Sequence, residues 1–342
     1  MPAAARKRRK AEPLENETPT EQLGRAELFD LYRQLLLIRR AEERLSQMFA
    51  DGEVPGFIHL SIGQEAVSVG VMSALGPEDT IASTHRGHGH AIAKGLPLEG
   101  FFAELLAKNE GLCRGRGGSM HVADISVGML GANGIVGAGL PIALGSALAH
   151  KTLQRPAIAV AFFGDGALAE GLLHECFNLA ALWTLPLLFV CENNGWGEFL
   201  PTSKQLAFNL EDFSAAFCIP HTTVDGNDVA AVAAAAERIV ARIRGGAGPA
   251  VLECLTTRVR GHFEGDAQKY RDPGELDGLA ERDPLRIGME ALRRLGATET
   301  DFAKAAEEIE RRIEAAMTAA RRGTDPVFEA AKADVYTSTE SR

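Results

Sequence analysis

The amino-acid sequence predicts an α/β fold with a doubly wound, mostly parallel sheet and helices on both of its faces. Residues 157–163 and 186–191 are short, continuous apolar runs of the kind found in strands that are buried on both faces. The segment between them, residues 167–182, has the pattern of a helix. A strand, a helix and a strand in this order form a βαβ unit, in which the two strands are parallel.

Further elements are predicted on both sides of this unit in the sequence. In residues 26–49 the apolar side chains, among them Leu28, Leu31 and Leu35, recur at the spacing of an amphipathic helix. Further helices are predicted over residues 64–75, over the alanine-rich residues 229–243 and over most of residues 283–322, which carry charges on an exposed face. A strand is predicted over residues 250–255 and a polar loop over residues 256–277. These elements describe one α/β domain with helical extensions.

The length of 342 residues corresponds to one large domain or two ordinary ones. We expect three parts: a disordered, solvated tail over residues 1–22, the α/β domain with its helical extensions over residues 23–330, and a short tail over residues 331–342. The first tail contains five consecutive cations at residues 6–10. This run is interpreted as part of the disordered tail, and the alternative is a localisation signal or an arm that binds nucleic acid.

The composition excludes several classes of protein. Lys and Arg number 36 and Asp and Glu number 46, so the net charge of −10 argues against a body that binds nucleic acid. No apolar run reaches the roughly 18 residues that span a membrane, and none near the start has the form of a secretory signal. The five cysteines are odd in number and lack a C-x-x-C spacing, which argues against a disulfide framework and the usual zinc sites. We therefore expect a cytoplasmic protein with a small-molecule substrate.

Residues 82–146 carry an unusual density of glycine and histidine. Three stretches stand out, HRGHGH at residues 85–90, CRGRGGSMH at 113–121 and GANGIVGAG at 131–139. Because glycine costs backbone entropy when it is ordered, this density indicates close approach of the backbone to a ligand or several special backbone dihedral angles. The alternative interpretation is a set of surface turns.

The turn after the first strand of the βαβ unit allows two interpretations. In the first, Gly164-x-Gly166-x-x-Ala169 matches the dinucleotide pattern G-x-G-x-x-A. Glu192 ends the next strand, where an acid that binds the ribose lies in such folds. Taken alone, these residues would indicate an NAD-dependent dehydrogenase.

The second interpretation is a site for Mg²⁺ and a diphosphate. Asp165 stands between the two glycines, where its carboxylate would face phosphates bound at a helix N-terminus, and only a cation makes that contact favourable. Asn193 and Asn194 end the neighbouring strand at the same edge of the sheet. Asp165, Asn194 and the backbone carbonyl of Trp196 offer oxygen ligands of the kind that Mg²⁺ prefers. This interpretation is favoured because it explains the aspartate and the asparagine pair together.

The same residues resemble a known motif. Gly164-Asp165-Gly166, a spacer of 26 residues and Asn193-Asn194 are similar to the motif that binds thiamin diphosphate. The resemblance extends over residues 26–330 to the alpha subunits of the E1 components of 2-oxo acid dehydrogenase complexes, which include acetoin dehydrogenase and pyruvate dehydrogenase. It is carried, in this order, by LYRQLLLIRRAEERLSQMF, GFIHLSIGQEAVSVG, THRGHGH, GRGGSMH, GANGIVGAG and RGHFEGDAQKYR. It implies a thiamin diphosphate-binding fold.

The resemblance implies a cofactor role for each matching position. The carboxylate of Asp165, the side chain of Asn194 and the carbonyl of Trp196 would ligate Mg²⁺. The other cofactor contacts would come from Arg86 to the diphosphate, from the backbone of Gly166 and Ala167 to the phosphates, from the backbone of Gly134 and Val136 to the aminopyrimidine, and from His262 beside the thiazolium.

The resemblance also implies the catalytic and substrate-binding residues. His262 lies in the polar loop and is expected to titrate near neutrality, so that it can stabilise charge or move a proton. His59 is the second catalytic candidate. Phe57, His59 and Glu170 would line the substrate pocket, and Glu170 stands where the family often carries a glutamine.

The implied reaction is cleavage of acetoin with release of acetaldehyde, or decarboxylation of pyruvate or a branched-chain 2-oxo acid. The acyl group then passes to a lipoyl group on an E2 acyltransferase. Acetoin is favoured, because pyruvate members of the family usually carry tyrosine at the position of His85 and GHS where this chain has Gly261-His262-Phe263. Phe263 also stands where animal enzymes carry a serine that kinases modify, so we predict no phosphorylation control at this residue.

One group that thiamin catalysis needs, a glutamate against the aminopyrimidine, has no assigned position in this chain. Single-chain thiamin enzymes carry a second domain of this kind and are longer than 342 residues. We therefore expect an E1 beta subunit as an obligate partner, in an α₂β₂ heterotetramer with the cofactor at the interface. Two other hypotheses stay open, an NAD-dependent dehydrogenase and a non-catalytic partner that keeps the fold.

Overall fold

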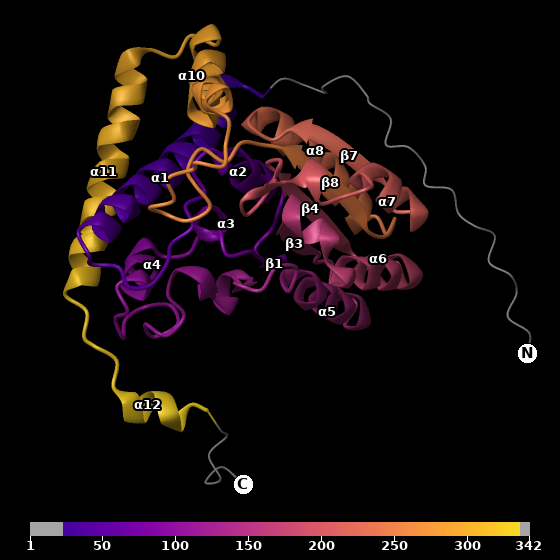
Figure 1. Cartoon of the computed structure of the whole chain (residues 1–342), viewed down its shortest axis with the longest axis horizontal. Coiled ribbons are helices and arrows are strands. Elements are labelled where there is room, and N and C mark those ends of the chain that lie inside the picture. Colours follow the sequence, from indigo (N-terminus) through magenta and orange to yellow (C-terminus); the bar gives the residue numbers. More distant parts are fainter. Residues whose placement is uncertain (1–22, 336–342) are drawn as a thin grey trace, which may run out of the picture.

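A six-stranded sheet forms the centre of the protein in a computed structural model, which describes residues 23–335 (Figure 1). The strand order is β2-β1-β3-β4-β8-β7, and all neighbours in it are parallel. The strands are β1 (Thr80–Ala82), β2 (Met129–Gly131), β3 (Ala159–Gly164), β4 (Leu187–Asn193), β7 (His221–Asp225) and β8 (Ala250–Leu255). The predicted α/β fold with a parallel sheet is confirmed.

The two strands of the predicted βαβ unit are the neighbours β3 and β4. They pair in register from Ala159 opposite Leu187 to Gly164 opposite Glu192. β3 ends one residue beyond its apolar run, at Gly164, and β4 extends through the polar Glu192 to Asn193. The predicted strand over residues 250–255 is β8, which pairs with the other side of β4.

The helix of the βαβ unit begins later than predicted. Asp165–Ala169 form a 3-10 turn, η3, and Glu170 has extended dihedral angles (φ −83°, ψ 131°), so α6 runs over Gly171–Trp183. The prediction of a helix over residues 167–182 was therefore wrong in its first turn. The carboxylate at the start of η3 is held by hydrogen bonds from Asn194 and Thr202, and sequence periodicity carries no information about such distant contacts.

Helices cover both faces of the sheet (Figure 1). On one side, the apolar core includes side chains of α1 (Arg25–Ala50), α2 (Glu65–Ser73), α4 (Leu98–Leu105), α8 (Val229–Arg244) and α11 (Glu299–Arg321). Of these, α8 packs on the strands, and α11 packs outside, on α1 and α4. The other face carries α5 (Gly139–Thr152) and α6. Along β3, Val160 belongs to the first apolar core and Ala161 to the second, as the alternation of side chains along a strand requires. The doubly wound arrangement is confirmed.

The predicted helical segment over residues 283–322 divides in two. α10 (Pro284–Arg294) and α11 are separated because Gly296 adopts a φ of +84° and the hydroxyl of Thr298 caps α11.

The glycine- and histidine-rich region over residues 82–146 also holds regular elements, including α3 (His88–Lys94), α4 and α5, rather than surface turns alone. The remaining elements are α7 (Leu210–Ala216), α9 (Pro273–Asp277), β5 (Trp196–Gly197), β6 (Leu200–Pro201), η1 (Ser119–His121), η2 (Ile125–Val127), η4 (Thr202–Lys204) and η5 (Gly278–Arg282).

The last helix, α12 (Phe328–Ala333), extends away from the body of the molecule (Figure 1) and crosses the predicted boundary at residue 330. Asp334, which follows it, forms ion pairs with Arg114 and Arg116. The predicted tail over residues 1–22, with its run of cations, lies outside the described residues, as do residues 336–342. In the described part of the chain, the helices are all too short or too polar to cross a membrane.

Candidate active site

A cavity of about 420 Å³ lies at the carboxyl ends of β3 and β4, the edge at which ligands bind in doubly wound folds. Eleven residues predicted for the site line it: His59, Arg86, Gly134, Val136, Asp165, Gly166, Ala167, Glu170, Asn194, Trp196 and His262. The fold therefore brings together side chains from segments that are far apart in the sequence.

Asp165 is buried at the start of η3, with 1% of its surface exposed. Its Oδ1 accepts a hydrogen bond from the backbone N of Asn194 at 3.4 Å, and its Oδ2 accepts one from the hydroxyl of Thr202. Both of these donors are uncharged. Burial raises the pKa of Asp165 to about 6. Because a buried carboxylate without a cationic partner is costly, a divalent cation beside Asp165 would stabilise its ionised form.

The side chains of the two asparagines in the predicted motif form hydrogen bonds with different partners. Asn193 Nδ2 donates to Glu253 Oε1 on β8 at 2.7 Å. Asn194 Nδ2 donates to Gln64 Oε1 at 2.9 Å, and its Oδ1 accepts from the backbone N of Trp196 at 3.1 Å. Of the pair, Asn194 lines the cavity, which places its amide with the carboxylate that follows β3.

The chain approaches itself closely beside Gly166. A Cβ atom at this residue would lie 3.1 Å from the Cα of Gly197, in the short antiparallel pair of β5 and β6. A larger side chain would push this pair, which carries Trp196, away from η3. The second glycine of the Gly-Asp-Gly pattern therefore has a packing reason in addition to its place at the cavity.

Arg86 is 5% exposed and joins two segments of the site. Its Nη1 donates to the carbonyl oxygen of Leu60 at 2.6 Å, and its Nη2 donates to the carbonyl oxygen of His262 at 3.0 Å. Burial lowers the pKa of Arg86 to about 10, so the side chain stays charged at neutral pH. Its guanidinium lines the cavity, and its remaining N–H donors suit an anion such as a phosphate.

Three histidines meet at the cavity. The ring centroids lie 4.8 Å apart for His59 and His85, 5.0 Å for His59 and His262, and 5.4 Å for His85 and His262. Burial and the nearby charge of Arg86 lower the pKa of all three, to about 3 for His59, to about 4 for His262 and well below the usual value for His85. The expectation that His262 titrates near neutrality is therefore wrong for the site without its ligands.

The same cluster contains a buried polar atom without a partner. Nδ1 of His59 is shielded from solvent and forms no hydrogen bond within the described residues. Native structures leave few buried polar atoms unsatisfied, and those that remain often mark a place where a ligand or water binds. His59 thus offers a neutral hydrogen-bonding group to a small polar molecule in the cavity.

A hydrogen-bond network orders the loop that carries His262. Asp266 Oδ2 accepts from the backbone N of His262 at 2.8 Å and from the hydroxyl of Tyr270 at 2.6 Å. Arg258 donates to the same hydroxyl at 2.9 Å and, through Nη1, to the carbonyl oxygen of Glu198 at 3.0 Å. Through these hydrogen bonds, the segment predicted as a polar loop is fixed to the turn between β5 and β6, which borders the cavity.

Phe57 is the one predicted site residue that does not line the cavity. Its side chain is 63% exposed, and its ring packs against Phe263 with 5.7 Å between centroids. Glu170 does line the cavity, beside Gly137. Further lining residues that the sequence did not single out for the site include Gln64, Met120 and Arg258, whereas Glu192, considered only for a dinucleotide, also lines the cavity. Of the first three, Gln64 alone had a usable signal, its place at the start of a predicted helix inside one of the motifs.

The residues of the cavity fit a diphosphate held with a divalent cation. Asp165 supplies a buried carboxylate whose hydrogen bonds within residues 23–335 come from uncharged donors, and Asn194 supplies an amide oxygen beside it. Oxygen ligands of these two kinds are those that Mg²⁺ prefers. Arg86 supplies a buried cation with free N–H donors on the wall of the same cavity.

Comparisons with known proteins identify the family of this chain. The sequence model of the family "Dehydrogenase E1 component" matches residues 33–328. The chain is 47% identical to the alpha subunit of the acetoin:2,6-dichlorophenolindophenol oxidoreductase of Bacillus subtilis, over 91% of this chain and 93% of that protein. It is 43% identical to the protein of the same name from Cupriavidus necator, over 99% of this chain and 100% of that protein.

A third relative carries a different name. The chain is 40% identical to the pyruvate dehydrogenase E1 component subunit alpha of Zymomonas mobilis, over 92% of this chain and 88% of that protein. The family model covers most of the described chain, and each of these relatives is matched along nearly its whole length. The chain therefore belongs to the dehydrogenase E1 component family of oxidoreductases.

Proposed function

We propose that this chain is the alpha subunit of a thiamin diphosphate- and Mg²⁺-dependent E1 enzyme that cleaves acetoin, releases acetaldehyde and passes the acetyl group to lipoyl-E2. The observation that carries the proposal is the buried carboxylate of Asp165 beside Asn194 at the carboxyl ends of β3 and β4. Two relatives named for acetoin, at 47% and 43% identity, support the choice of substrate.

Different residues of this chain would bind different parts of the cofactor. Asp165, Asn194 and the carbonyl of Trp196 would hold Mg²⁺, and Arg86 with the backbone of Gly166 would hold the diphosphate. The backbone of Ala167 would add a phosphate contact, and that of Gly134 and Val136 would contact the aminopyrimidine. When bound, thiamin diphosphate supplies the carbanion that adds to the substrate carbonyl.

The charge of the cavity favours an uncharged substrate. Among the described lining residues, the lysine and arginine side chains are those of Arg86 and Arg258. Arg258 already bonds Glu198 and Tyr270, and we assign Arg86 to the diphosphate. The substrate then meets the neutral imidazoles of the histidine cluster. These groups suit the hydroxyl and carbonyl of acetoin, whereas the carboxylate of a 2-oxo acid would lack a cationic partner.

His59 and His262 are proposed as the catalytic residues of this chain. Both are neutral at neutral pH, so each can donate one hydrogen bond and accept another. The unpartnered Nδ1 of His59 is placed to bond a substrate oxygen, and His262 can accept or return the hydroxyl proton of acetoin. The loop network around Asp266 holds the backbone of His262 in place while the proton moves.

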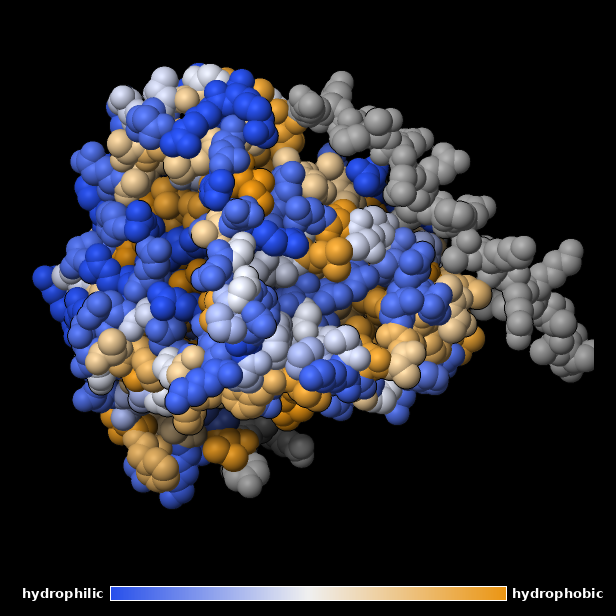
Figure 2. Space-filling view, turned by 45° about the horizontal axis from the view of Figure 1, so that its top comes forward, coloured by the Kyte–Doolittle hydropathy of each residue, from blue (hydrophilic) through white to orange (hydrophobic). Residues whose placement is uncertain are grey.

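A beta subunit is proposed as the partner that completes the site. Ile135 and Val136, beside the cavity, are 72% and 48% exposed, and Ile142 and Leu148 on α5 are 43% and 40% exposed. Figure 2 shows several apolar patches of this kind on one face of the molecule. Exposed apolar groups in this number are typical of a surface that another subunit covers. We assign the missing glutamate to that subunit and expect an α₂β₂ assembly.

The interpretation as an NAD site is not proposed. Glu192, the residue suggested for the ribose, is buried, and its Oε1 lies 3.3 Å from His90 Nε2. A carboxylate engaged in this way is a poor acceptor for a ribose hydroxyl. Pyruvate remains the second candidate substrate, because a relative at 40% identity is named for it.

The test is turnover by the chain co-purified with its beta subunit. Acetoin, pyruvate and a branched-chain 2-oxo acid are compared with thiamin diphosphate, Mg²⁺ and 2,6-dichlorophenolindophenol as electron acceptor. We expect the highest kcat/KM with acetoin, none without Mg²⁺ and none with the Asp165→Ala variant. Robust turnover by this chain alone would contradict the shared active site, and higher kcat/KM with pyruvate would replace the substrate.

A further inference from the structure

Gln64 reaches the cavity from an element that is remote from Asn194 in the sequence. It precedes the first residue of α2 and is 2% exposed. Its Oε1 accepts a hydrogen bond of 2.9 Å from Asn194 Nδ2, across 130 positions of the chain. This is a contact between a proposed metal ligand and a buried side chain that none of the functional assignments above uses.

The contact matters because an asparagine amide has two orientations that differ by exchange of its oxygen and nitrogen. Only the oxygen is a metal ligand. At one end of the Asn194 amide lies the backbone N–H of Trp196, which can only donate, at 3.1 Å. At the other end lies Gln64 Oε1, which can only accept. The backbone N–H of Trp196 requires the oxygen of Asn194 on its side, and Gln64 Oε1 satisfies the Nδ2 group in that orientation. The second lone pair of Asn194 Oδ1 then remains for a metal.

The turn that carries Gln64 is held by its own backbone. Gly63 has a φ of +99°, and a Cβ atom there would lie 2.2 Å from the carbonyl oxygen of Thr257. Its carbonyl accepts hydrogen bonds of 3.2 Å from Asn227 Nδ2 and from the hydroxyl of Thr256. The chain before Gln64 is therefore packed directly against the segment that leads to the loop of His262.

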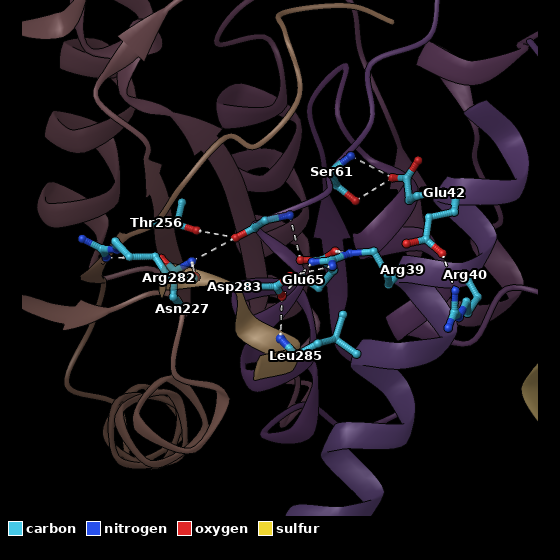
Figure 3. A network of polar contacts seen from close by, with 12 residues as sticks. Arg39, Arg40, Glu42, Ser61, Glu65, Asn227, Thr256, Arg282, Asp283 and Leu285 are labelled. Carbon is cyan, nitrogen blue, oxygen red and sulfur yellow. Dashed lines mark hydrogen bonds and ion pairs between the residues drawn. The ribbon is translucent and has the colours of Figure 1, made fainter. Parts of the chain in front are cut away.

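A buried ion-pair network ties the same turn to two helices (Figure 3). Glu65 is fully buried, and its Oε2 accepts from the backbone N of Gly63 at 2.8 Å. Its Oε1 accepts from Arg39 Nε at 2.5 Å, and Arg39 donates to both oxygens of Asp283 at 2.9 and 3.1 Å. Removing one member of such a buried network is strongly destabilising, so the turn has little freedom to move.

We propose that Gln64 is a positioning residue, the acceptor that fixes the amide of Asn194 with its oxygen toward the metal site. Groups outside the ligand sphere often orient metal ligands in this way, and their loss typically weakens metal binding about 10–100-fold. The inference rests on the proposed function, because Asn194 is assigned there as a ligand. Gln64 itself touches neither metal nor substrate in this role.

The test measures binding of Mn²⁺ as the probe, by electron paramagnetic resonance, to the alpha–beta complex with thiamin diphosphate present. Gln64→Met keeps the length of the side chain and removes the acceptor, so we expect the Kd for Mn²⁺ to rise about 10-fold or more. Gln64→Glu keeps an acceptor for Asn194 Nδ2, so its Kd should stay within a few-fold of the unmodified complex.

A second pair of variants separates orientation from a general structural effect. Asn194→Asp replaces the amide by a carboxylate, whose two oxygens are equivalent and need no orienting acceptor. In this background Gln64→Met should change the Kd for Mn²⁺ much less than it does beside Asn194. Such a double-mutant cycle reports the coupling between the two residues. The proposal would be overturned if Gln64→Met raised the Kd for Mn²⁺ by the same factor beside Asn194 and in the Asn194→Asp variant.

The matched control is Gln47→Met on the exposed side of α1, where the side chain donates to Asp51, and it should leave the Kd unchanged. If Gln64→Met does not fold, Gln64→Asn, whose shorter side chain cannot reach Asn194, takes its place with the same expectation. If the unmodified complex binds no Mn²⁺ with thiamin diphosphate, the proposed function fails. If it binds and Gln64→Met binds equally well, the positioning role alone is overturned.

Discussion

The guanidinium of Arg86 donates a hydrogen bond to the carbonyl oxygen of His262 at 3.0 Å, and so joins the glycine-rich segment to the loop after β8. A second hydrogen bond from Arg86 reaches the carbonyl oxygen of Leu60, next to His59. One buried cation therefore sets the distance between the two proposed catalytic histidines and faces the proposed phosphate site.

Arg86→Lys should damage both of these functions. Lysine offers a single point charge and cannot bond two carbonyls and a phosphate with a planar fork. We expect the Kd for thiamin diphosphate to rise about 10-fold or more, and the loop over residues 256–277 to be cut faster by trypsin. Arg260→Lys, on the exposed side of the same loop, is the control. Unchanged affinity and unchanged cleavage in the Arg86 variant would contradict this role.

Metal binding should fall in acid because of Asp165. Burial raises the pKa of this carboxyl to about 6 in the absence of the metal, so it is ionised above that pH and protonated below it. A proton and a metal compete for the same oxygens. The affinity for Mn²⁺ should be flat above pH 7 and fall roughly tenfold per pH unit below about 6.

The measurement is a Mn²⁺ titration of the complex between pH 5 and pH 8. Free thiamin diphosphate is titrated in parallel, because its terminal phosphate also takes up a proton in this range. Asp165→Asn should bind weakly at every pH and lose the dependence that the unmodified complex shows beyond that of the free cofactor. An affinity independent of pH in the unmodified complex would contradict the assignment of Asp165.

The histidine cluster should make the protein less stable in acid. His59 and His262 have pKa values of about 3 and about 4, below the usual value, because burial disfavours their charged forms. The unfolded chain takes up protons near pH 6.5 and the folded chain does not, so the free energy of unfolding decreases as the pH falls from about 6.5 toward 4. The raised pKa of Asp165 has the opposite effect, because below about pH 6 the folded chain takes up this proton before the unfolded chain does, which increases the free energy of unfolding.

His59→Gln isolates the contribution of one member of the cluster. The Tm of the cofactor-free complex is measured between pH 4.5 and pH 8 for the variant and the unmodified protein. The difference between the two should change in favour of the variant as the pH falls, because glutamine takes up no proton. A difference in Tm that does not depend on pH would contradict the lowered pKa of His59.

Gly63→Ala should be strongly destabilising. The φ of +99° is unfavourable for alanine, and the added Cβ atom would lie 2.2 Å from a backbone oxygen. We expect a loss of about 2–4 kcal/mol in the free energy of unfolding, from strain and displacement together. Gly52→Ala is the matched control, because Gly52 has a φ of +76° but no atom within 4 Å of the added Cβ. Gly52→Ala should lower the free energy of unfolding by about 1 kcal/mol. If both variants lowered it equally, the close contact at Gly63 would not contribute to the destabilisation.

Much of the fold follows from local patterns in the sequence. The apolar runs that became β3 and β4 are buried on both faces, so they needed no partner to be recognised as strands. The amphipathic spacing of α1 and the alanine-rich sequence of α8 predicted those helices closely. Strands β1 and β2 have only three residues each, too few to show a period, and they form because β3 offers β1 an edge to pair with.

The candidate site could likewise be predicted only in part. Asp165 and the asparagine pair could be selected because a parallel sheet brings the carboxyl ends of neighbouring strands to one edge. The late start of α6 could not be predicted, because η3 is shaped by Thr202 and Asn194 rather than by neighbours in the sequence. The placement of Phe57 outside the cavity likewise depends on how its ring packs against Phe263.

The sequence by itself determined which chemical groups the site contains, since carboxylate, amide, guanidinium and imidazole are properties of residue types in a recognisable order. The tertiary structure decided what those groups can do. Burial moves the pKa of Asp165 up and those of the histidines down, because a low-dielectric surrounding disfavours charge. Packing alone brings Gln64 to Asn194 and Arg86 to His262, because contacts across more than 100 residues depend on the whole fold.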